Sequence, residues 1–287
     1  MKINPNQIKI AIPNKGRLRE PAISLLKKSG YKFRTKERAL YATCTNSDLV
    51  VIFTRADDIP VLVDKGAVDL GITGQDLIEE REATVSNLLD LGFGRCKLCL
   101  AIPENQDLKS LKVLEGKTIA TSFPTITKNY FSKQNIKVQT VELNGSVEIM
   151  VALEFADVIV DLVESGDTLK QNKLKSFETI GTYQSVLIAN PNKENDPEIQ
   201  KLKRRFEGIL VASRYSILEY NIPKAKITDA ENITPGFKSP TIASLEDDKW
   251  LAVKVMVEKS IVVDVMDKLE ALGATAIFET AIDNCRL

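Results

Sequence analysis

Short runs of β-branched and other apolar residues alternate with amphipathic segments over about the first two hundred residues. A short apolar run bounded by turn residues predicts a buried strand, and apolar residues at every third or fourth position predict a helix. The predicted strands are 8–12, 49–53, 68–72, 98–102, 118–121, 138–143 and 157–161, and the predicted helices include 20–29, 59–65 and one from about residue 75. This alternation predicts an α/β protein with largely parallel sheets, whose ligands bind at the carboxyl ends of strands.

The pattern changes after the polar segment 191–197, which contains two prolines. A single long helix is predicted over 198–213, with Ile199, Leu202 and Phe206 on its apolar stripe. The elements predicted beyond it are strand 215–221, helix 223–233, strand 241–245, strand 250–257, helix 260–272 and strand 275–281. Because this is the ferredoxin-like βαββαβ order, we expect a separate C-terminal module.

Charge and hydropathy narrow the class of protein. Among 287 residues, 39 basic and 39 acidic side chains cancel, so no net charge attracts nucleic acid or an acidic membrane. No apolar run reaches the roughly 20 residues that span a bilayer, and the first residues lack the apolar core of a signal peptide. We therefore expect a cytoplasmic protein.

The sequence contains no histidine, which excludes a Ser-His-Asp triad, a Cys-His pair and an HExxH zinc site. Cys96 and Cys99 form a CxxC, but on a predicted strand two residues three apart point to opposite faces. With no second CxxC, reduced structural cysteines are expected. Any chemistry must use carboxylates, Lys, Arg, hydroxyls, backbone amides or an added metal ion.

The segment 161–169, Asp-Leu-Val-Glu-Ser-Gly-Asp-Thr-Leu, follows a predicted strand. Backbone amides in such a loop form an anion site, and hydroxyls at its tip add donors. An acid at the strand end, here Asp161, can accept hydrogen bonds from a ribose diol. The loop therefore suits a sugar phosphate, although a simple turn with a helix cap would use the same residues.

Three other segments carry candidate groups. Lys15 and Arg17 flank a glycine after the first predicted strand and could bind a diphosphate or triphosphate, or could be solvated loop charges. The segment 69–76, Asp-Leu-Gly-Ile-Thr-Gly-Gln-Asp, leads from a strand into a helix and suits an anion or a plain turn. Glu148, after a Gly-Ser turn, could bind ribose hydroxyls or a magnesium-bound phosphate, or could simply begin a helix.

Taken in order, these segments resemble the ATP phosphoribosyltransferase family, which commits ATP and phosphoribosyl pyrophosphate to histidine biosynthesis. Segments 91–95, 119–124, 235–241 and 282–286 extend the match over nearly the whole chain, which resembles the long form of the family. The resemblance implies a two-lobed catalytic region like a periplasmic binding protein and a C-terminal ferredoxin-like (ACT-like) regulatory domain. Residues 1–94 and 180–213 would form the first lobe, 95–179 the second and 214–287 the regulatory domain.

The resemblance also implies the reaction, in which N1 of the ATP adenine displaces pyrophosphate from C1 of the ribose with Mg²⁺ held by substrate phosphates. Positioning and electrostatic stabilisation would dominate, so no residue is assigned as acid or base. The donor would be bound by Asp161, on the ribose hydroxyls, and by Ser165, Gly166, Asp167 and Thr168 around the 5-phosphate. ATP would be contacted by Lys15, Gly16, Arg17, Thr73, Gly74 and Glu148, with Lys15 and Arg17 acting electrostatically and Glu148 a candidate magnesium ligand.

Feedback inhibition by histidine is implied for the C-terminal module, with Asn221, Phe237, Thr241 and Ala276 as contacts. Core packing would explain Phe237 and Ala276 equally well. The family implies a homo-oligomer, dimeric or hexameric, that couples the two sites. No nucleic-acid or membrane partner is expected.

Four positions depart from the family pattern. Val151 replaces the usual proline and Glu154 the usual glycine, and a glutamate there is costly if the backbone has a positive φ. Glu164 and Asp167 place two carboxylates in segment 161–169, which we call the phosphate loop. These changes raise the alternative of a catalytically weak or inactive relative that binds small molecules.

Two other protein classes fit the sequence less well. A type I phosphoribosyltransferase usually carries two adjacent acids in its donor loop, whereas here Asp161 is followed by Leu162. A two-lobed binding or sensor protein would need neither the cations at 15 and 17 nor the donor loop.

Overall fold

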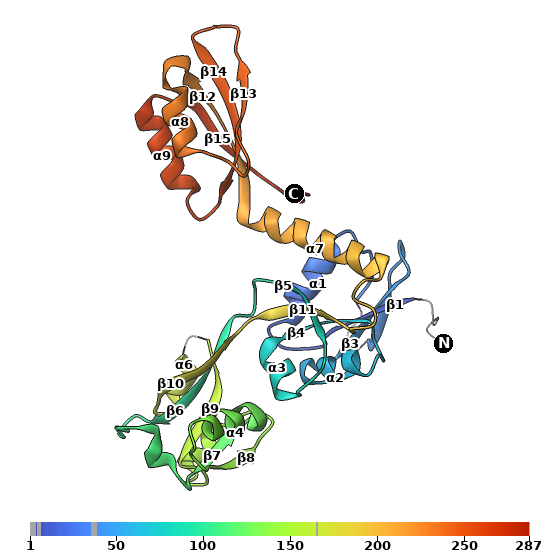
Figure 1. Ribbon diagram of the computed structural model, residues 1–287, viewed down its shortest axis with the longest axis vertical. Helices are drawn as coiled ribbons and strands as arrows, with labels where there is room; N and C mark the ends of the chain where they lie inside the picture. The colour runs from blue at the N-terminus through green and yellow to red at the C-terminus, as the bar shows by residue number, and fades with distance from the viewer. Residues whose placement is uncertain (1–3, 5–6, 36–38, 165, 287) are drawn as a thin grey trace. The chain divides into compact units, whose positions relative to one another are not determined.

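The computed structural model describes residues 4, 7–35, 39–164 and 166–286, and its strands form three sheets (Figure 1). The chain divides into two compact units, one of Met1–Ser24 and Tyr31–Gln200, the other of Leu25–Gly30 and Lys201–Leu287. The first unit holds two of the sheets, and the second unit holds the third.

The first sheet has six strands in the order β2-β3-β1-β4-β11-β5. β3, β1 and β4 run parallel, and residues such as Ile10 and Ile12 are fully buried because helices or other strands cover both faces. We call this sheet and its helices the first lobe. Its elements are β1 (Ile8–Pro13), α1 (Arg19–Lys28), β2 (Tyr41–Thr43), β3 (Leu49–Thr54), α2 (Ile59–Asp64), β4 (Leu70–Gly74), α3 (Gln75–Glu80), β5 (Ser86–Asp90) and β11 (Ser185–Ala189).

The second sheet has five strands in the order β10-β6-β9-β7-β8 and forms, with its helices, the second lobe. Phe131 and Ile126 of α4 pack on one face, and Leu169 of α6 packs on the other. Its elements are β6 (Cys96–Pro103), β7 (Thr118–Thr121), α4 (Pro124–Lys133), β8 (Gln139–Glu142), α5 (Ile149–Ala152), β9 (Val158–Val163), α6 (Asp167–Gln171) and β10 (Leu174–Tyr183).

Both of these sheets are mixed, so the prediction of largely parallel sheets is wrong. The chain passes from the first lobe to the second between β5 and β6, and returns between β10 and β11 through Gln184. β6 and β10 pair antiparallel with each other, β6 also pairs antiparallel with β9, and β11 pairs antiparallel with both β4 and β5. The predicted lobe boundary at 179/180 falls inside β10, and the domain limits stay a prediction.

The C-terminal sheet has the order β13-β14-β12-β15, with every pair antiparallel. In Figure 1, α8 and α9 lie on the same face of this sheet, and their apolar residues share one core with alternate residues of β12 and β14. The predicted ferredoxin-like module is therefore confirmed. The elements of this part are α7 (Pro197–Arg214), β12 (Tyr215–Pro223), α8 (Ile227–Ile233), β13 (Thr241–Ser244), β14 (Trp250–Glu258), α9 (Val262–Leu272) and β15 (Thr275–Ala281).

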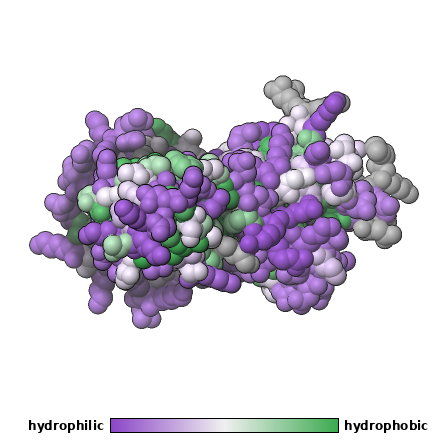
Figure 2. Space-filling model, turned by 90° about the horizontal axis from the view of Figure 1, so that it is seen from above, coloured by the Kyte–Doolittle hydropathy of each residue, from purple (hydrophilic) through white to green (hydrophobic). Residues whose placement is uncertain are grey.

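Hydrophilic residues cover most of the surface visible in Figure 2, with hydrophobic residues in small groups between them. Among the described residues, no helix combines the length and apolar character that crossing a bilayer requires.

Glu154 has a left-handed backbone conformation, with φ +54°. It follows the end of α5, where its N–H donates to the carbonyl of Val151 (3.0 Å) and the N–H of Phe155 donates to that of Met150 (2.9 Å). This pair of bonds is the Schellman ending of a helix, in which the left-handed position favours glycine because any Cβ there is crowded. The glutamate at this position therefore strains the backbone.

We predict that Glu154→Gly raises the free energy of unfolding by about 1 kcal/mol, since it removes the left-handed strain and returns only part of that gain as chain entropy. Urea unfolding of the purified chain measures the change. Glu154→Ala is the matched control, because it removes the side chain but keeps the strain, and it should give no gain. Equal stabilisation by both variants would show that the side chain, not the backbone, is unfavourable.

Candidate active site

The loop between β1 and α1 carries the predicted cations. The N–H of Asn14 donates to the carbonyl of Thr54 (2.7 Å), which fixes the start of the loop against β3. Gly16 then turns the chain with φ +80°, and the N–H of Arg19 donates to its carbonyl (3.2 Å). Lys15 is exposed to solvent, whereas the Arg17 side chain is 32% exposed and points toward the second lobe's loop.

The loop between β9 and α6 carries the predicted donor site. Asp161 is a half-buried residue of β9, and Gly166 precedes α6 in a left-handed conformation (φ +83°, ψ 3°). Thr168, in the first turn of α6, is exposed. A residue with a side chain would be strained at Gly166, so the glycine sets the turn that brings the loop back over β9. Ser165 lies outside the described residues.

A cavity of about 320 Å³ brings together residues from three of the predicted segments. It is lined by Arg17, Glu148, Asp161, Leu162, Val163, Glu164, Gly166, Thr168 and Leu169. The first-lobe loop, the residue before α5 and the phosphate loop thus converge although Arg17 and Glu164 are 147 residues apart. Of the other predicted site residues, Lys15, Gly16, Thr73, Gly74 and Asp167 do not line it.

Arg17 forms an ion pair with Glu164, which also lines the cavity, and lies near the Cys96 thiol and the Asp76 carboxylate. Burial raises the pKa of Asp76, an effect that the charge of Arg17 partly offsets. No sequence pattern marks Cys96 or Asp76 as a neighbour of Arg17. Cys96 comes near it through the packing of the two lobes, and Asp76 through the pairing of β1 with β4 within the first lobe.

The pKa of Asp161 reflects its place in the cavity. Burial, with a smaller contribution from the nearby Glu148 carboxylate, raises the pKa of Asp161 to about 6, although the N–H of Leu162 donates to its Oδ1 (2.8 Å) and acts in the opposite sense. Two carboxylates that repel each other beside a phosphate loop are suited to ribose hydroxyls or to a cation shared with phosphate oxygens.

Thr73 and Gly74 are the last residues of β4 and are buried, rather than forming an open loop. The Thr73 hydroxyl donates to the carbonyl of Ala56 (3.1 Å), which gives it a structural partner. A Cβ on Gly74 would collide with the Asp76 carboxylate, so close approach explains this glycine.

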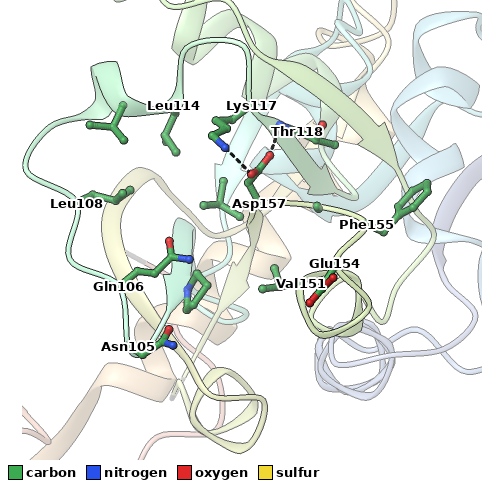
Figure 3. A pocket seen from close by; sticks show the side chains of 14 residues that line it. Asn105, Gln106, Leu108, Leu114, Lys117, Thr118, Val151, Glu154, Phe155 and Asp157 are labelled. Atoms are coloured by element: carbon green, nitrogen blue, oxygen red, sulfur yellow. Dashed lines mark hydrogen bonds and ion pairs between the residues drawn. The ribbon is translucent and has the colours of Figure 1, made fainter.

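Three of the four departures from the family pattern, Val151, Glu154 and Asp167, do not line the cavity. Val151 and Glu154 line a different cavity of about 600 Å³, which shares no lining residue with the first. Figure 3 shows this second cavity, where the Nζ of Lys117 donates to Asp157 (2.9 Å). Neither Val151 nor Glu154 therefore changes a group beside Asp161. Glu164, by contrast, lines the first cavity and pairs with Arg17.

Cys96 and Cys99 face opposite sides of β6, as their spacing predicts. All four cysteines are unpaired, and Cys96 and Cys99 are buried. Cys96 belongs to the core on the α4 face, whereas the Cys99 thiol lies 3.8 Å from the Thr179 hydroxyl. Among all the residues that the structure describes, no group of three or more Cys, Asp or Glu side chains is placed to hold a metal ion.

The four residues predicted to bind histidine do not form one cluster within a chain. Asn221 in β12 pairs with Thr275, next to Ala276, which has φ +49°. Phe237 instead contacts Tyr215 edge to face, with ring centroids 6.1 Å apart, at the other end of β12. Asn221 lies six positions along β12 from Tyr215, which corresponds to about 20 Å. Thr241 opens the exposed edge strand β13.

The raised pKa of Asp161 predicts a pH-dependent loss of stability relative to Asp161→Asn. The folded-state pKa of Asp161, about 6, lies above the ordinary value of 3.8. The free energy of unfolding of the wild type relative to Asp161→Asn is therefore highest below pH 3.8, and this advantage is lost as the pH rises through 6. We expect a difference on the order of 1 kcal/mol, reduced by solvent screening at this half-buried site.

Thermal unfolding of both proteins between pH 4 and pH 7 measures this difference. Asp157→Asn is the matched control of opposite sign, because a hydrogen bond from Lys117 lowers the pKa of Asp157. A wild-type advantage over Asp161→Asn that grows with pH would contradict the assignment.

Comparison with known proteins places the chain. Residues 55–208 match the family model described as ATP phosphoribosyltransferase, and residues 212–284 match the model described as HisG, C-terminal domain. A curated ATP phosphoribosyltransferase of Rhodopirellula baltica is 48% identical over 280 residues, which cover 98% of this chain and 94% of that protein. One of Yarrowia lipolytica is 40% identical, covering 98% of this chain and 97% of that protein.

A solved structure agrees with the two-lobed fold. The ATP phosphoribosyl transferase (HisG:HisZ) complex from Thermotoga maritima has a chain that is 28% identical, with a TM-score of 0.62 over 70% of this chain and 99% of that one. The two family models match the second lobe and part of the first, over residues 55–208, and the ferredoxin-like module, over residues 212–284, which is the combination of the long form. The chain therefore belongs to the ATP phosphoribosyltransferase family of enzymes.

Proposed function

We propose that this enzyme transfers the 5-phosphoribosyl group of phosphoribosyl pyrophosphate to N1 of the adenine of ATP and releases pyrophosphate, the first step of histidine biosynthesis. Family membership supports the reaction. The observation that carries the proposal in this chain is the cavity in which Arg17 of the first lobe meets Asp161, Gly166 and Thr168 of the second.

The donor would lie across this cavity. Its 5-phosphate would contact the backbone at Gly166 and the Thr168 hydroxyl, and its ribose hydroxyls would donate to the Asp161 carboxylate. The pyrophosphate would extend toward Arg17, whose guanidinium can bind two phosphate oxygens at once. Lys15, exposed on the same loop, would add a second positive charge.

The transfer requires positioning more than acid-base chemistry. The C1–oxygen bond to pyrophosphate breaks, pyrophosphate leaves with the electron pair, and the N1 lone pair forms the new bond to C1. Positive charge grows on the ribose while negative charge grows on the leaving group. Arg17 and Lys15 would stabilise the departing pyrophosphate, and Asp161 would stabilise the ribose, which is consistent with a chain that has no histidine.

Magnesium would complete the charge balance. Three carboxylates and one guanidinium line the cavity, so a donor with several negative charges would be repelled without a cation. Asp161 and Glu148 are oxygen ligands of the kind that Mg²⁺ takes, and substrate phosphates would supply further oxygens. The ion would neutralise the phosphate oxygens.

ATP would approach from the first lobe. The carboxyl end of β4, with Thr73 and Gly74, is the position where nucleotide contacts are expected in an α/β lobe. Because the Thr73 hydroxyl already bonds to Ala56, contacts there would come from the backbone. Gly16, in the Arg17 loop, would allow close approach of the triphosphate.

Histidine would inhibit through the C-terminal module, with Asn221, Thr241, Phe237 and Ala276 as the proposed contacts. The enzyme would act in the cytoplasm as a homo-oligomer, dimeric or hexameric, in which the two sites are coupled.

Pyrophosphate release from ATP, phosphoribosyl pyrophosphate and Mg²⁺ tests the proposal. We expect turnover that falls when histidine is added, and Thr168→Ala should raise KM for the donor at least about tenfold, since it removes a hydrogen bond to a charged phosphate, and leave KM for ATP nearly unchanged. Thr168→Ser keeps the hydroxyl and is the matched control. Absence of turnover in the wild type would refute the reaction, turnover indifferent to histidine would refute only the regulation, and equal KM losses for both substrates would refute the role of the loop.

A further inference from the structure

α3 of the first lobe contacts α4 of the second lobe through the side chain of Glu80. Its two carboxylate oxygens accept hydrogen bonds from consecutive backbone N–H groups of α4, Oε1 from Thr125 (3.0 Å) and Oε2 from Ile126 (3.1 Å). Glu80 is half-buried, so water competes only in part for these bonds. One carboxylate thus joins two sheets that the chain crosses only between β5 and β6 and between β10 and β11.

α4 has no cap of its own at this end. Phe123 occupies the N-cap position without a side-chain cap hydrogen bond, and Pro124 follows it as the first helical residue. The next two N–H groups, those of Thr125 and Ile126, are the donors that a helix leaves without an intrahelical partner. Their acceptor comes from the other lobe, and a negative charge at this end of the helix is favoured by the helix dipole.

Two neighbouring residues of α3 reinforce the contact. Leu77 packs against the apolar core of the second lobe that includes Phe131 and Leu98. Tyr183, at the end of β10, donates from its hydroxyl to Glu79 (2.9 Å). α3 therefore follows directly from β4 of the first lobe, while its side chains contact the second lobe.

The start of α3 lies beside the active-site arginine. Asp76, buried in the first turn of α3, is close enough to Arg17 for its pKa to respond to the charge. Arg17 reaches from the first lobe into the cavity lined by the phosphate loop of the second. The helix that is anchored to α4 at its end thus begins with a buried carboxylate near Arg17, the side chain that faces the other lobe.

We infer that Glu80 is a positioning residue for the proposed reaction: by capping α4 across the lobes, it holds Arg17 at the distance from the phosphate loop at which one donor molecule contacts both. The inference rests on the proposed function, because it assumes that the donor spans the cavity. Glu80 touches neither substrate, and its effect reaches the donor through the relative position of the lobes. Loss of the cap would lower the preorganisation of the cavity and so weaken only those ligands that both lobes contact.

Two ligands distinguish binding that needs both lobes from binding that needs only the second lobe. Phosphoribosyl pyrophosphate has a 5-phosphate for the second lobe and a pyrophosphate for Arg17, whereas ribose 5-phosphate has only the group for the second lobe. Isothermal titration of the full-length chain in the presence of Mg²⁺ gives Kd for each, and steady-state kinetics give KM and kcat. Glu80→Ala should weaken phosphoribosyl pyrophosphate about tenfold in Kd and KM, and change ribose 5-phosphate less than twofold.

Two variants control the experiment. Glu80→Gln keeps one acceptor oxygen, so its Kd for phosphoribosyl pyrophosphate should lie between those of the wild type and Glu80→Ala. Glu115→Ala removes a carboxylate that accepts from the N–H of Lys137 (3.0 Å) within the second lobe, and it should leave both ligands unchanged. These two variants distinguish the cap across the lobes from the general loss of a carboxylate.

Several outcomes would overturn the inference. Unchanged or tighter binding of phosphoribosyl pyrophosphate by Glu80→Ala would show that the cap does not set the binding position. Equal weakening of both ligands, or equal effects of Glu115→Ala, would indicate general damage. A wild-type chain that does not bind phosphoribosyl pyrophosphate would instead refute the proposed function itself.

Discussion

One guanidinium and three carboxylates line the cavity between the lobes, and this imbalance of charge governs what can bind there. Arg17 already pairs with Glu164, and burial raises the pKa of Asp161. In the proposed reaction, a phosphorylated ligand would draw Arg17 away from Glu164, and an accompanying cation would neutralise the remaining carboxylates. The proposed magnesium-bound donor would thus depend on the charges of the loop itself, in a sequence that contains no histidine.

The fold sets the distance between Arg17 and the phosphate loop. Arg17 follows β1 and the phosphate loop follows β9, which are central strands of separate sheets, so each loop is rigidly based but their separation is set by contacts between the lobes. α3 provides such contacts through Leu77 and Glu80. The result is a site whose local parts are fixed by strand ends and whose assembly depends on a few side chains far from the reacting atoms.

Sequence patterns predicted most of the individual strands, helices and turns. The strands 118–121 and 275–281 and the turn at Gly166 follow from apolar runs and turn residues, and the convergence of loops at strand ends follows from the α/β pattern. The strands β5, β10 and β11 are absent from the predicted elements, and their antiparallel pairing depends on the return of the chain between the lobes, which no local pattern specifies. The pair of Arg17 with Glu164 and the strain at Glu154 depend on packing and on φ, which no single-sequence pattern specifies.

The central claim is that the donor occupies the cavity between Arg17 and the phosphate loop. A crystal structure of the chain with phosphoribosyl pyrophosphate and Mg²⁺ tests it most directly. The account predicts the 5-phosphate within hydrogen-bond distance of Gly166 and Thr168, and the Arg17 guanidinium on the pyrophosphate instead of on Glu164. Donor bound elsewhere, with the pair of Arg17 and Glu164 intact, would contradict it.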